Sequence, residues 1–108
     1  MEKEKVNRTA LTDGTGRWFD LNKTVVFNEA SEWDGNNWIS LATGSQWQHE
    51  KLYKTAGNRF ILGTWSNYQG VMDTYTEITK EEAARWLSIN NHEPDELCKD
   101  EFFALEIE

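Results

Sequence analysis

Apolar and polar side chains alternate in short runs between residues 17 and 78, and turn residues separate the runs. Alternation places successive side chains on opposite faces of an extended chain, so each run predicts a β-strand with one buried face. The predicted strands cover residues 17–21, 24–33, 38–42, 49–55, 59–66 and 73–78. Short connections join neighbouring runs, which predicts antiparallel pairing in a meander.

Residues 23–33 fit two periodicities, that of a strand and that of a helix. Val26, Ala30 and Trp33 have the spacing of one helical face, whereas the same stretch also alternates residue by residue. The β-branched and aromatic side chains at its start favour a strand. The sequence leaves both structures open here, with the strand favoured.

Two turns are clearly marked. Asp34–Asn37 combines Asp, Gly and Asn, which accept turn conformations at little cost. Ala56–Asn58 predicts a tight hairpin, and we expect a positive φ at Gly57 or Asn58 because two right-twisted strands need such a connection. A Val at Gly57 is then expected to cost more stability than the same change at Gly14.

The period changes to that of a helix after Ile78. Thr79 and Glu82 have the spacing of a capping box, in which each side chain bonds to the other residue's backbone N–H. The side chains that repeat on one face are Ala83, Trp86, Leu87 and Asn90. This stripe predicts a helix that buries Trp86 and Leu87 against the sheet.

A second, shorter helix is predicted after Asn91. Pro94 suits its first turn, because the missing N–H has no helical partner there. Asp95 and Glu96 complement the positive end of such a helix. The expected buried stripe consists of Leu97, Cys98, Phe102 and Leu105.

These elements predict an α+β fold: an antiparallel β-meander of five or six strands with two C-terminal α-helices packed on one face and the other face solvated. A chain of 108 residues has room for one hydrophobic core, so we expect a single domain over residues 13–108. The sheet would occupy residues 13–78 and the helices residues 79–105. Residues 1–12 carry alternating charges without apolar periodicity, which predicts a flexible N-terminal tail.

The net charge of −8 lies entirely in residues 61–108, which hold eleven acidic and three basic side chains. A negative surface repels bare nucleic acid and attracts a basic partner protein. The acidic side chains that flank the helical stripes are the predicted partner-binding residues, Glu93, Asp95, Glu96 and Asp100. The sequence thus predicts a protein partner with a basic surface and no direct contact with nucleic acid.

Aromatic and amide side chains are concentrated in residues 33–69. The candidate ligand-binding residues are Trp38, Trp47, Trp65 and Tyr68. These rings could stack on a planar ligand or a sugar, while Asn and Gln bond to its rim. The competing interpretation is that the rings pack in the core and the amides fill turns. Trp47 and Tyr68 are expected to be exposed, and a concave row of exposed rings would favour a ligand-binding module.

No grouping of nucleophile, base and metal ligand is evident from spacing. His49 and Glu50 are adjacent on a predicted strand and therefore point to opposite faces. One cysteine and two histidines do not make a zinc site. We expect no enzyme activity, no cofactor and no metal. No run reaches the length of a membrane span and the charged N-terminus is unlike a signal peptide, which predicts a cytoplasmic protein without membrane contact.

Five segments support a resemblance, namely Trp33–Ser40, Ala42–Trp47, His49–Tyr53, Thr64–Gly70 and Glu82–Leu87. With these segments, the chain from Gly16 to Asn91 resembles a small bacterial protein family associated with mobile elements and plasmids. That family has no known activity, so the resemblance implies a genetic context and no chemistry. We therefore expect a non-enzymatic protein-interaction or regulatory protein of a bacterial mobile element, acting through an acidic C-terminal surface. The alternative is a small-ligand or carbohydrate-binding module that uses exposed aromatic loops.

Overall fold

The structure, a computed structural model, describes residues 6–108. Its strands are β1 (Arg8–Ala10), β2 (Trp18–Asp20), β3 (Val25–Asn28), β4 (Ser31–Trp33), β5 (Trp38–Ser40), β6 (Gln48–Lys54), β7 (Phe60–Ser66) and β8 (Thr74–Ile78). Its helices are the 3₁₀-helix η1 (Leu21–Lys23), α1 (Lys80–Ile89), the 3₁₀-helix η2 (Glu96–Cys98) and α2 (Lys99–Phe103). None of these helices is both long and apolar enough to span a bilayer.

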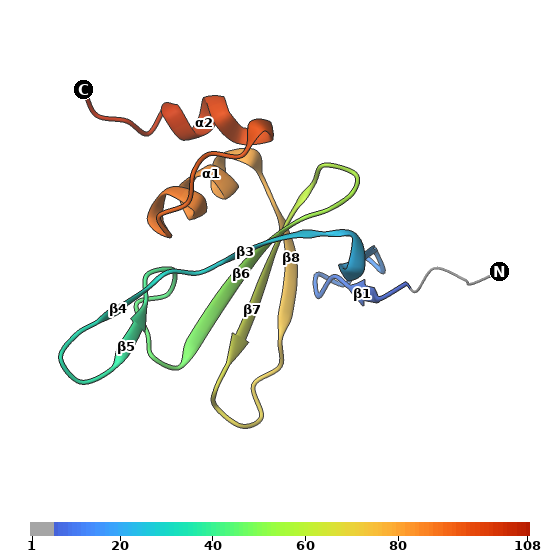
Figure 1. The fold of residues 1–108 in the computed structure, drawn as a ribbon. Coiled ribbons are helices and arrows are strands. Elements are labelled where there is room, and N and C mark those ends of the chain that lie inside the picture. Colours follow the sequence, from blue (N-terminus) through green and yellow to red (C-terminus); the bar gives the residue numbers. More distant parts are fainter. Residues whose placement is uncertain (1–5) are drawn as a thin grey trace.

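The centre of the fold is a four-stranded antiparallel sheet in the order β3-β6-β7-β8. Figure 1 shows α1 and α2 together at one end of the molecule and the β4–β5 hairpin reaching away from them. β1 pairs with β2 and β4 with β5, each as a separate two-stranded sheet. The α+β class, the antiparallel pairing and the two C-terminal helices are confirmed. The single meander of five or six strands is wrong, because residues 6–108 form eight strands in three sheets.

Residues 23–33 are largely extended, but they divide between two sheets. β3 pairs with β6, and β4 pairs with β5. Between them, Glu29 directs its carboxylate at His49, and the Ala30 N–H donates to Oδ1 of Asn90 at 3.0 Å. The strand prediction is therefore confirmed, whereas one continuous strand is wrong because side-chain bonds replace ladder bonds at these two positions.

One core lies between the sheet and the helices. Its buried members are Leu52, Phe60, Ala83, Ala84, Trp86, Leu87 and Cys98. Trp86 is 7% exposed and Leu87 is fully buried, so the predicted packing of α1 on the sheet is confirmed. α1 begins at the predicted capping box, in which Thr79 and Glu82 bond to each other's backbone N–H.

A second core lies on the opposite face of the sheet, next to the β1–β2 hairpin. Leu11 and Phe19 pack there with Tyr53 and Ile61 of the central sheet. Gly63 in β7 makes room for the aromatic rings, because a Cβ at this position would lie 2.8 Å from the ring of Tyr53. The expectation of one covered and one solvated face is therefore wrong, since both faces bury side chains.

Residues 8–12 belong to the folded domain. β1 pairs with β2, Leu11 is buried, and the Thr12 N–H donates to a carbonyl of β8 at 2.8 Å. The flexible tail predicted for residues 1–12 is wrong over this part. The side chain of Arg8 is exposed, but the backbone here is held by a hairpin partner that the charge pattern does not reveal. Residues 1–5 lie outside the described part of the chain.

The second helical segment differs from the prediction at both ends. Pro94 precedes it, and Asp95 caps η2 by accepting a hydrogen bond from the Leu97 N–H at 3.0 Å. Cys98 is fully buried as predicted, but Leu105 lies beyond α2 and is exposed. The buried stripe is shorter than expected because α2 ends before it reaches this position.

Candidate functional site

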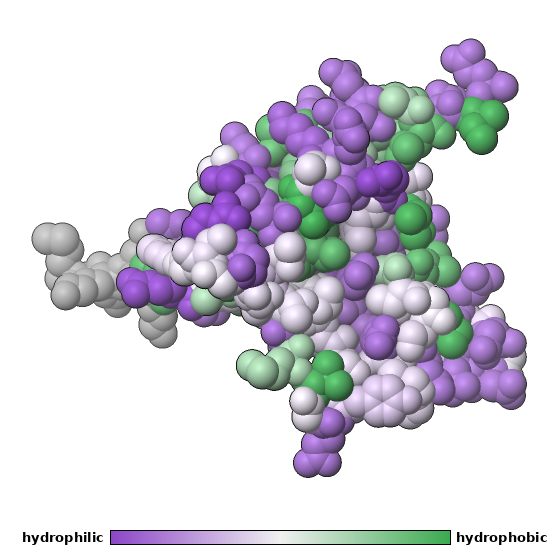
Figure 2. Space-filling view, turned by 180° about the vertical axis from the view of Figure 1, so that it is seen from behind, coloured by the Kyte–Doolittle hydropathy of each residue, from purple (hydrophilic) through white to green (hydrophobic). Residues whose placement is uncertain are grey.

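The end of the molecule away from the helices is built from three connections: the β4–β5 hairpin, the loop before β6 and the loop between β7 and β8 (Figure 1). Large rings emerge from these connections. The exposed ones are Trp38 (62%), Tyr68 (54%), Trp33 (52%) and Trp47 (42%). We call these four residues the aromatic end. Figure 2 shows pale and green side chains gathered at this lower end of the molecule, beside purple polar ones. Clustered exposed apolar surface of this kind marks contact sites.

The four rings form two pairs. Trp33 and Trp38 oppose each other across the β4–β5 hairpin, with ring centroids 5.6 Å apart. Trp47 and Tyr68 have centroids 5.1 Å apart, and the Asn67 N–H donates to the Trp47 carbonyl at 2.8 Å. Each ring is thus held by a neighbouring ring while much of its surface stays in water.

Trp33 is the member of the aromatic end that the sequence analysis did not select. Asp34 holds the turn beside it, because its carboxylate accepts from the N–H groups of Asn37 at 2.7 Å and Asn36 at 2.8 Å. The bond from Asn37, followed by that from Asn36, lowers the pKa of Asp34. A signal for Trp33 was present in the sequence, since residues that flank a four-residue turn symmetrically become cross-strand neighbours.

Trp65 differs from the other predicted rings because it is half-buried. Its ring stacks on His49 with centroids 5.3 Å apart and an interplanar angle of 24°. The ammonium group of Lys51 lies 5.3 Å from the Trp65 ring centroid. The prediction that Trp47 and Tyr68 are exposed is confirmed, and Trp38 is exposed as well. Trp65 instead packs on His49 and is half-buried.

A chain of hydrogen bonds connects the roots of the three connections. The Ser40 hydroxyl donates to Oε2 of Glu29, and Nδ1 of His49 lies 2.5 Å from Oε1 of the same carboxylate. At the other side of the ring, Nε2 of His49 lies 3.0 Å from Nδ2 of Asn67. Because Ser40 is almost fully buried and Glu29 and His49 are half-buried, this network holds the loops in fixed positions.

The same network is poorly arranged for catalysis. A triad needs its nucleophile on the imidazole nitrogen that faces away from the carboxylate. Here Ser40 contacts the carboxylate of Glu29 instead, and Asn67 occupies Nε2 of His49. Glu50 takes part in a different contact, because its carboxylate accepts from the Trp86 indole N–H at 3.1 Å on the helix-facing side. The side chains of His49 and Glu50 thus have different partners, although the Glu50 backbone N–H also donates to the Glu29 carboxylate.

A cavity of about 280 Å³ opens beside Trp65. Polar side chains such as Glu50, Thr64 and Thr74 line it together with the apolar Val71 and Met72. Burial raises the pKa of Glu50, the bond from Trp86 lowers it, and the charge of Glu29 raises it further, with a net upward shift. None of the four rings of the aromatic end lines this cavity. This cavity therefore does not supply a concave site for the exposed rings.

The predicted acidic residues fall into two groups. Glu93, Glu96 and Asp100 are exposed. Asp95 instead is half-buried, with Oδ2 2.9 Å from Nζ of Lys54. Partial burial alone would raise the pKa of Asp95, but the bonds from Lys54 and from the Leu97 N–H lower it overall. Asp95 therefore joins the helical segment to β6, and only the other three are available to a partner.

Metal ligands do not converge within residues 6–108, where no group of three or more His, Cys, Asp or Glu side chains could hold an ion. Cys98 is buried in the helix-facing core, and burial raises the pKa of its thiol. His92 stacks on Trp86, and its Nε2 lies 2.6 Å from the Asn28 carbonyl. Cys98 and His92 thus both pack in the fold and contribute to its structure.

No family model, curated protein or solved structure matches this chain. The resemblance to a family of mobile elements therefore rests on the sequence segments given above and stands as a proposal.

Proposed function

We propose that this chain is a non-enzymatic interaction protein that binds a partner protein through the aromatic end. The observation that supports this most directly is the exposure of the four rings, from 42% to 62%, on connections that are fixed at their roots. Trp and Tyr most often carry the binding energy of protein interfaces, because they bury a large area in well-packed contacts. Rings already held by contact with a neighbouring ring also lose little further freedom when a partner covers them.

The arrangement of the rings favours a protein partner over a small ligand. A small ligand is held in a concave site whose groups converge on it. The pair Trp33–Trp38 sits on a projecting hairpin, and the pair Trp47–Tyr68 lies on two other loops (Figure 1). A partner protein can cover both pairs with one continuous surface.

Charge narrows the class of partner to proteins with a basic surface. Glu93, Glu96 and Asp100 are exposed in a part of the chain that carries the whole net charge of −8. Such a field steers a basic protein toward the molecule and repels bare nucleic acid. Together with the resemblance, this leads us to propose a regulatory role in a bacterial mobile element, in the cytoplasm.

To test this proposal, single rings of the aromatic end are replaced by Ala and the affinity for the partner protein is measured. A tagged copy captures the partner from the native host, and the purified partner is then titrated against Trp38→Ala and Trp47→Ala. We expect each change to weaken binding about tenfold or more, the range of interface hot spots. Trp18→Ala is the matched control, because Trp18 is 50% exposed and lies on the β1–β2 hairpin. Equal affinities for all three variants would exclude the aromatic end as the contact surface.

A carbohydrate-binding module is the second candidate, favoured by the exposed pair Trp47–Tyr68, whose ring centroids lie 5.1 Å apart. Flat exposed rings are suited to stacking against a sugar. Titration with cellohexaose, followed by tryptophan fluorescence, separates the two candidates. Saturable quenching that Trp47→Ala abolishes would support the carbohydrate module, whereas an unchanged signal with retained partner binding supports the interaction protein.

A further inference from the structure

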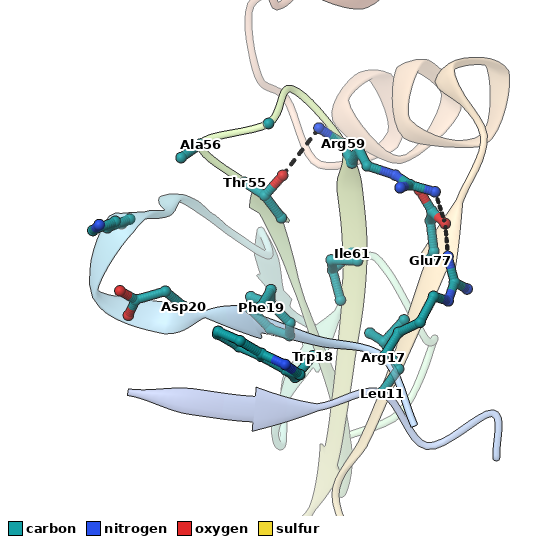
Figure 3. Close-up of a pocket in the computed structure, with 12 residues that line it drawn as sticks. Leu11, Arg17, Trp18, Phe19, Asp20, Thr55, Ala56, Arg59, Ile61 and Glu77 are labelled. Carbon is teal, nitrogen blue, oxygen red and sulfur yellow. Dashed lines mark hydrogen bonds and ion pairs between the residues drawn. The ribbon is translucent and has the colours of Figure 1, made fainter. Parts of the chain in front are cut away.

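A second cavity, also of about 280 Å³, lies on the sheet face that bears the β1–β2 hairpin (Figure 3). Leu11, Phe19 and Ile61 line it, and all three are buried members of the second core. Trp18 forms part of the wall, and Figure 3 shows it beside Phe19. The floor is therefore apolar, and one exposed aromatic ring is available to a ligand. This cavity shares no residue with the aromatic end.

Two arginines and one carboxylate form the rim of this cavity. Nη1 of Arg17 and Nη2 of Arg59 each lie 2.8 Å from Oε1 of Glu77 (Figure 3). The pKa of Glu77 is lowered by Arg59 first and by Arg17 second. Glu77 bonds to both guanidinium groups, and Asp13 supplies a second carboxylate through its ion pair with Arg17.

The two guanidinium groups differ in what else they contact. Arg17 also binds Asp13 at 3.1 Å and Thr15 at 3.2 Å, which occupies its remaining nitrogens. Arg59 directs Nε and Nη2 at Glu77, and within residues 6–108 its Nη1 has no hydrogen-bond partner. The Arg59 side chain is 60% exposed. Arg59 is therefore the cation that can accept an incoming anion without giving up its existing bonds.

Charged groups of both signs surround the cavity. The guanidinium of Arg8 lies 4.7 Å above the Trp18 ring, and Lys23, Asp20 and Glu77 are lining residues. The feature that favours an anion is therefore the exposed Arg59, whose Nη1 has no hydrogen-bond partner within residues 6–108.

We propose that this cavity binds a small organic anion with a flat apolar body, of the aryl carboxylate or aryl phosphate class. The apolar body would lie against Trp18 and the floor, where burial and ring stacking favour it. The anionic group would bind Arg59, because a guanidinium presents paired N–H donors that match a carboxylate or phosphate. The volume is at the small end of ligand sites, about 300 Å³, which suits a single ring system. This site is independent of partner binding at the aromatic end.

Titration of the full chain with phenyl phosphate and with benzoate tests the proposal. Two-dimensional NMR should show saturable shifts at the Trp18 indole N–H and at the amides of Arg59 and Ile61. The probe with the higher affinity, phenyl phosphate or benzoate, shows whether the cavity prefers a phosphate or a carboxylate. Benzyl alcohol has the same ring without the charge and should bind at least about tenfold more weakly. Equal binding of benzyl alcohol, or equal binding of inorganic phosphate alone, would overturn the proposal.

Two substitutions on the rim should act in opposite directions. Arg59→Gln removes the free donor and should weaken phenyl phosphate binding about tenfold. Glu77→Gln removes the negative charge that competes with an anion for Arg59 and should strengthen phenyl phosphate binding severalfold. Arg85→Gln is the matched control, since Arg85 is an exposed arginine of α1 on the helix side of the sheet and should leave the affinity unchanged.

Thermal melting of each variant verifies that the fold persists, so that lost binding reports on the site. Trp18→Ala should weaken the charged and the neutral probe alike, because it removes the ring contact they share. The proposal is overturned if Arg59→Gln and Glu77→Gln shift the affinity in the same direction or leave it unchanged. The Trp18→Ala variant should still bind the partner protein, because Trp18 is not part of the aromatic end. Loss of anion binding with unchanged partner binding therefore concerns the cavity alone.

Discussion

Trp86 joins three parts of the fold through one side chain. Its ring is buried in the helix-facing core, it stacks on His92 with centroids 6.0 Å apart, and its indole N–H donates to Glu50 of β6. By contrast, the tryptophans of the aromatic end contact one ring each and remain half in water. At the residue scale, the same amino acid therefore serves stability in one place and contact in another.

Trp86→Ala should lower the free energy of unfolding by about 3 to 5 kcal/mol, the usual range for removing a large ring from a core. Trp38→Ala is the control and should change it by less than about 1 kcal/mol, because its ring is mostly exposed. Urea unfolding of both variants measures the difference. Similar losses for both would contradict the packing of α1 on the sheet.

Glu50→Gln should stabilise the fold at neutral pH. The folded-state pKa of Glu50 is raised, chiefly by burial, so the charged carboxylate is disfavoured in the native protein at about pH 7. A Gln amide oxygen still accepts the bond from Trp86 and carries no charge. The gain should shrink as the pH falls below the ordinary carboxyl value of 4.5, where Glu50 is protonated in both states.

Urea midpoints at about pH 7 and about pH 4 measure this effect. Glu93→Gln is the control for the loss of one negative charge, because Glu93 is exposed. A gain at neutral pH that equals the control, or that persists unchanged in acid, would show that burial of the charge is not the cause.

At the scale of elements, the turn between β6 and β7 has the predicted kind of backbone, but at a different residue from the glycine. Asn58 adopts a φ of 64°, so the expected positive φ at Gly57 or Asn58 is confirmed. Gly57 itself has no positive φ, whereas Gly14 has a φ of 79°. The expectation that Gly57 is more sensitive than Gly14 therefore does not follow from this backbone, because the residue with the special conformation is Asn58.

Gly14→Ala should destabilise the fold by about 1 kcal/mol, because an L-residue is strained in the left-handed region. No atom lies within 4 Å of the added Cβ, so the cost comes from the backbone alone. Gly57→Ala should be neutral or slightly stabilising, since it reduces the freedom of the unfolded chain without strain. Thermal unfolding compares the two, and a larger loss at Gly57 would contradict the observed φ values.

On the scale of the whole molecule, the three proposed surfaces occupy different places. The exposed Glu93, Glu96 and Asp100 lie in the C-terminal helical segment and the turn before it, the aromatic end lies at the end of the sheet away from the helices, and the arginine-rimmed cavity lies on the sheet face that bears the β1–β2 hairpin (Figures 1 and 3). Under the proposed function, charge would steer a partner while the rings make the contact. The proposed anion site would be independent of both.

Reversing Glu93, Glu96 and Asp100 to Lys should slow association with a basic partner and leave the fold intact, because all three side chains are exposed. Attraction between exposed charges is screened over about 8 Å at physiological ionic strength, so added salt should slow the wild type toward the variant. Stopped-flow or surface-binding kinetics at low and high salt measure this. An unchanged rate in the variant, indifferent to salt, would reduce the acidic surface to a solubilising role.

The sequence alone determined the features that depend on neighbours within a few residues. Alternation located β6, β7 and β8, the Thr79–Glu82 spacing located the start of α1, and the stripe containing Trp86 identified its buried face. The exposure of Trp47 and Tyr68 also followed from their loop positions. These signals are local because periodicity, capping and turn chemistry act over one or two turns of chain.

Only the tertiary structure decided the features that depend on distant partners. Arg17 meets Glu77 across 60 positions, and Ala30 meets Asn90 across another 60. Leu11, in the segment predicted as a tail, is buried because the β1–β2 hairpin packs on the sheet. Such contacts form only when the chain is compact, and the packing of the whole molecule decides which distant residues meet. Local periodicity therefore determined the elements, while packing over long sequence separations decided where they lie and which cavities they enclose.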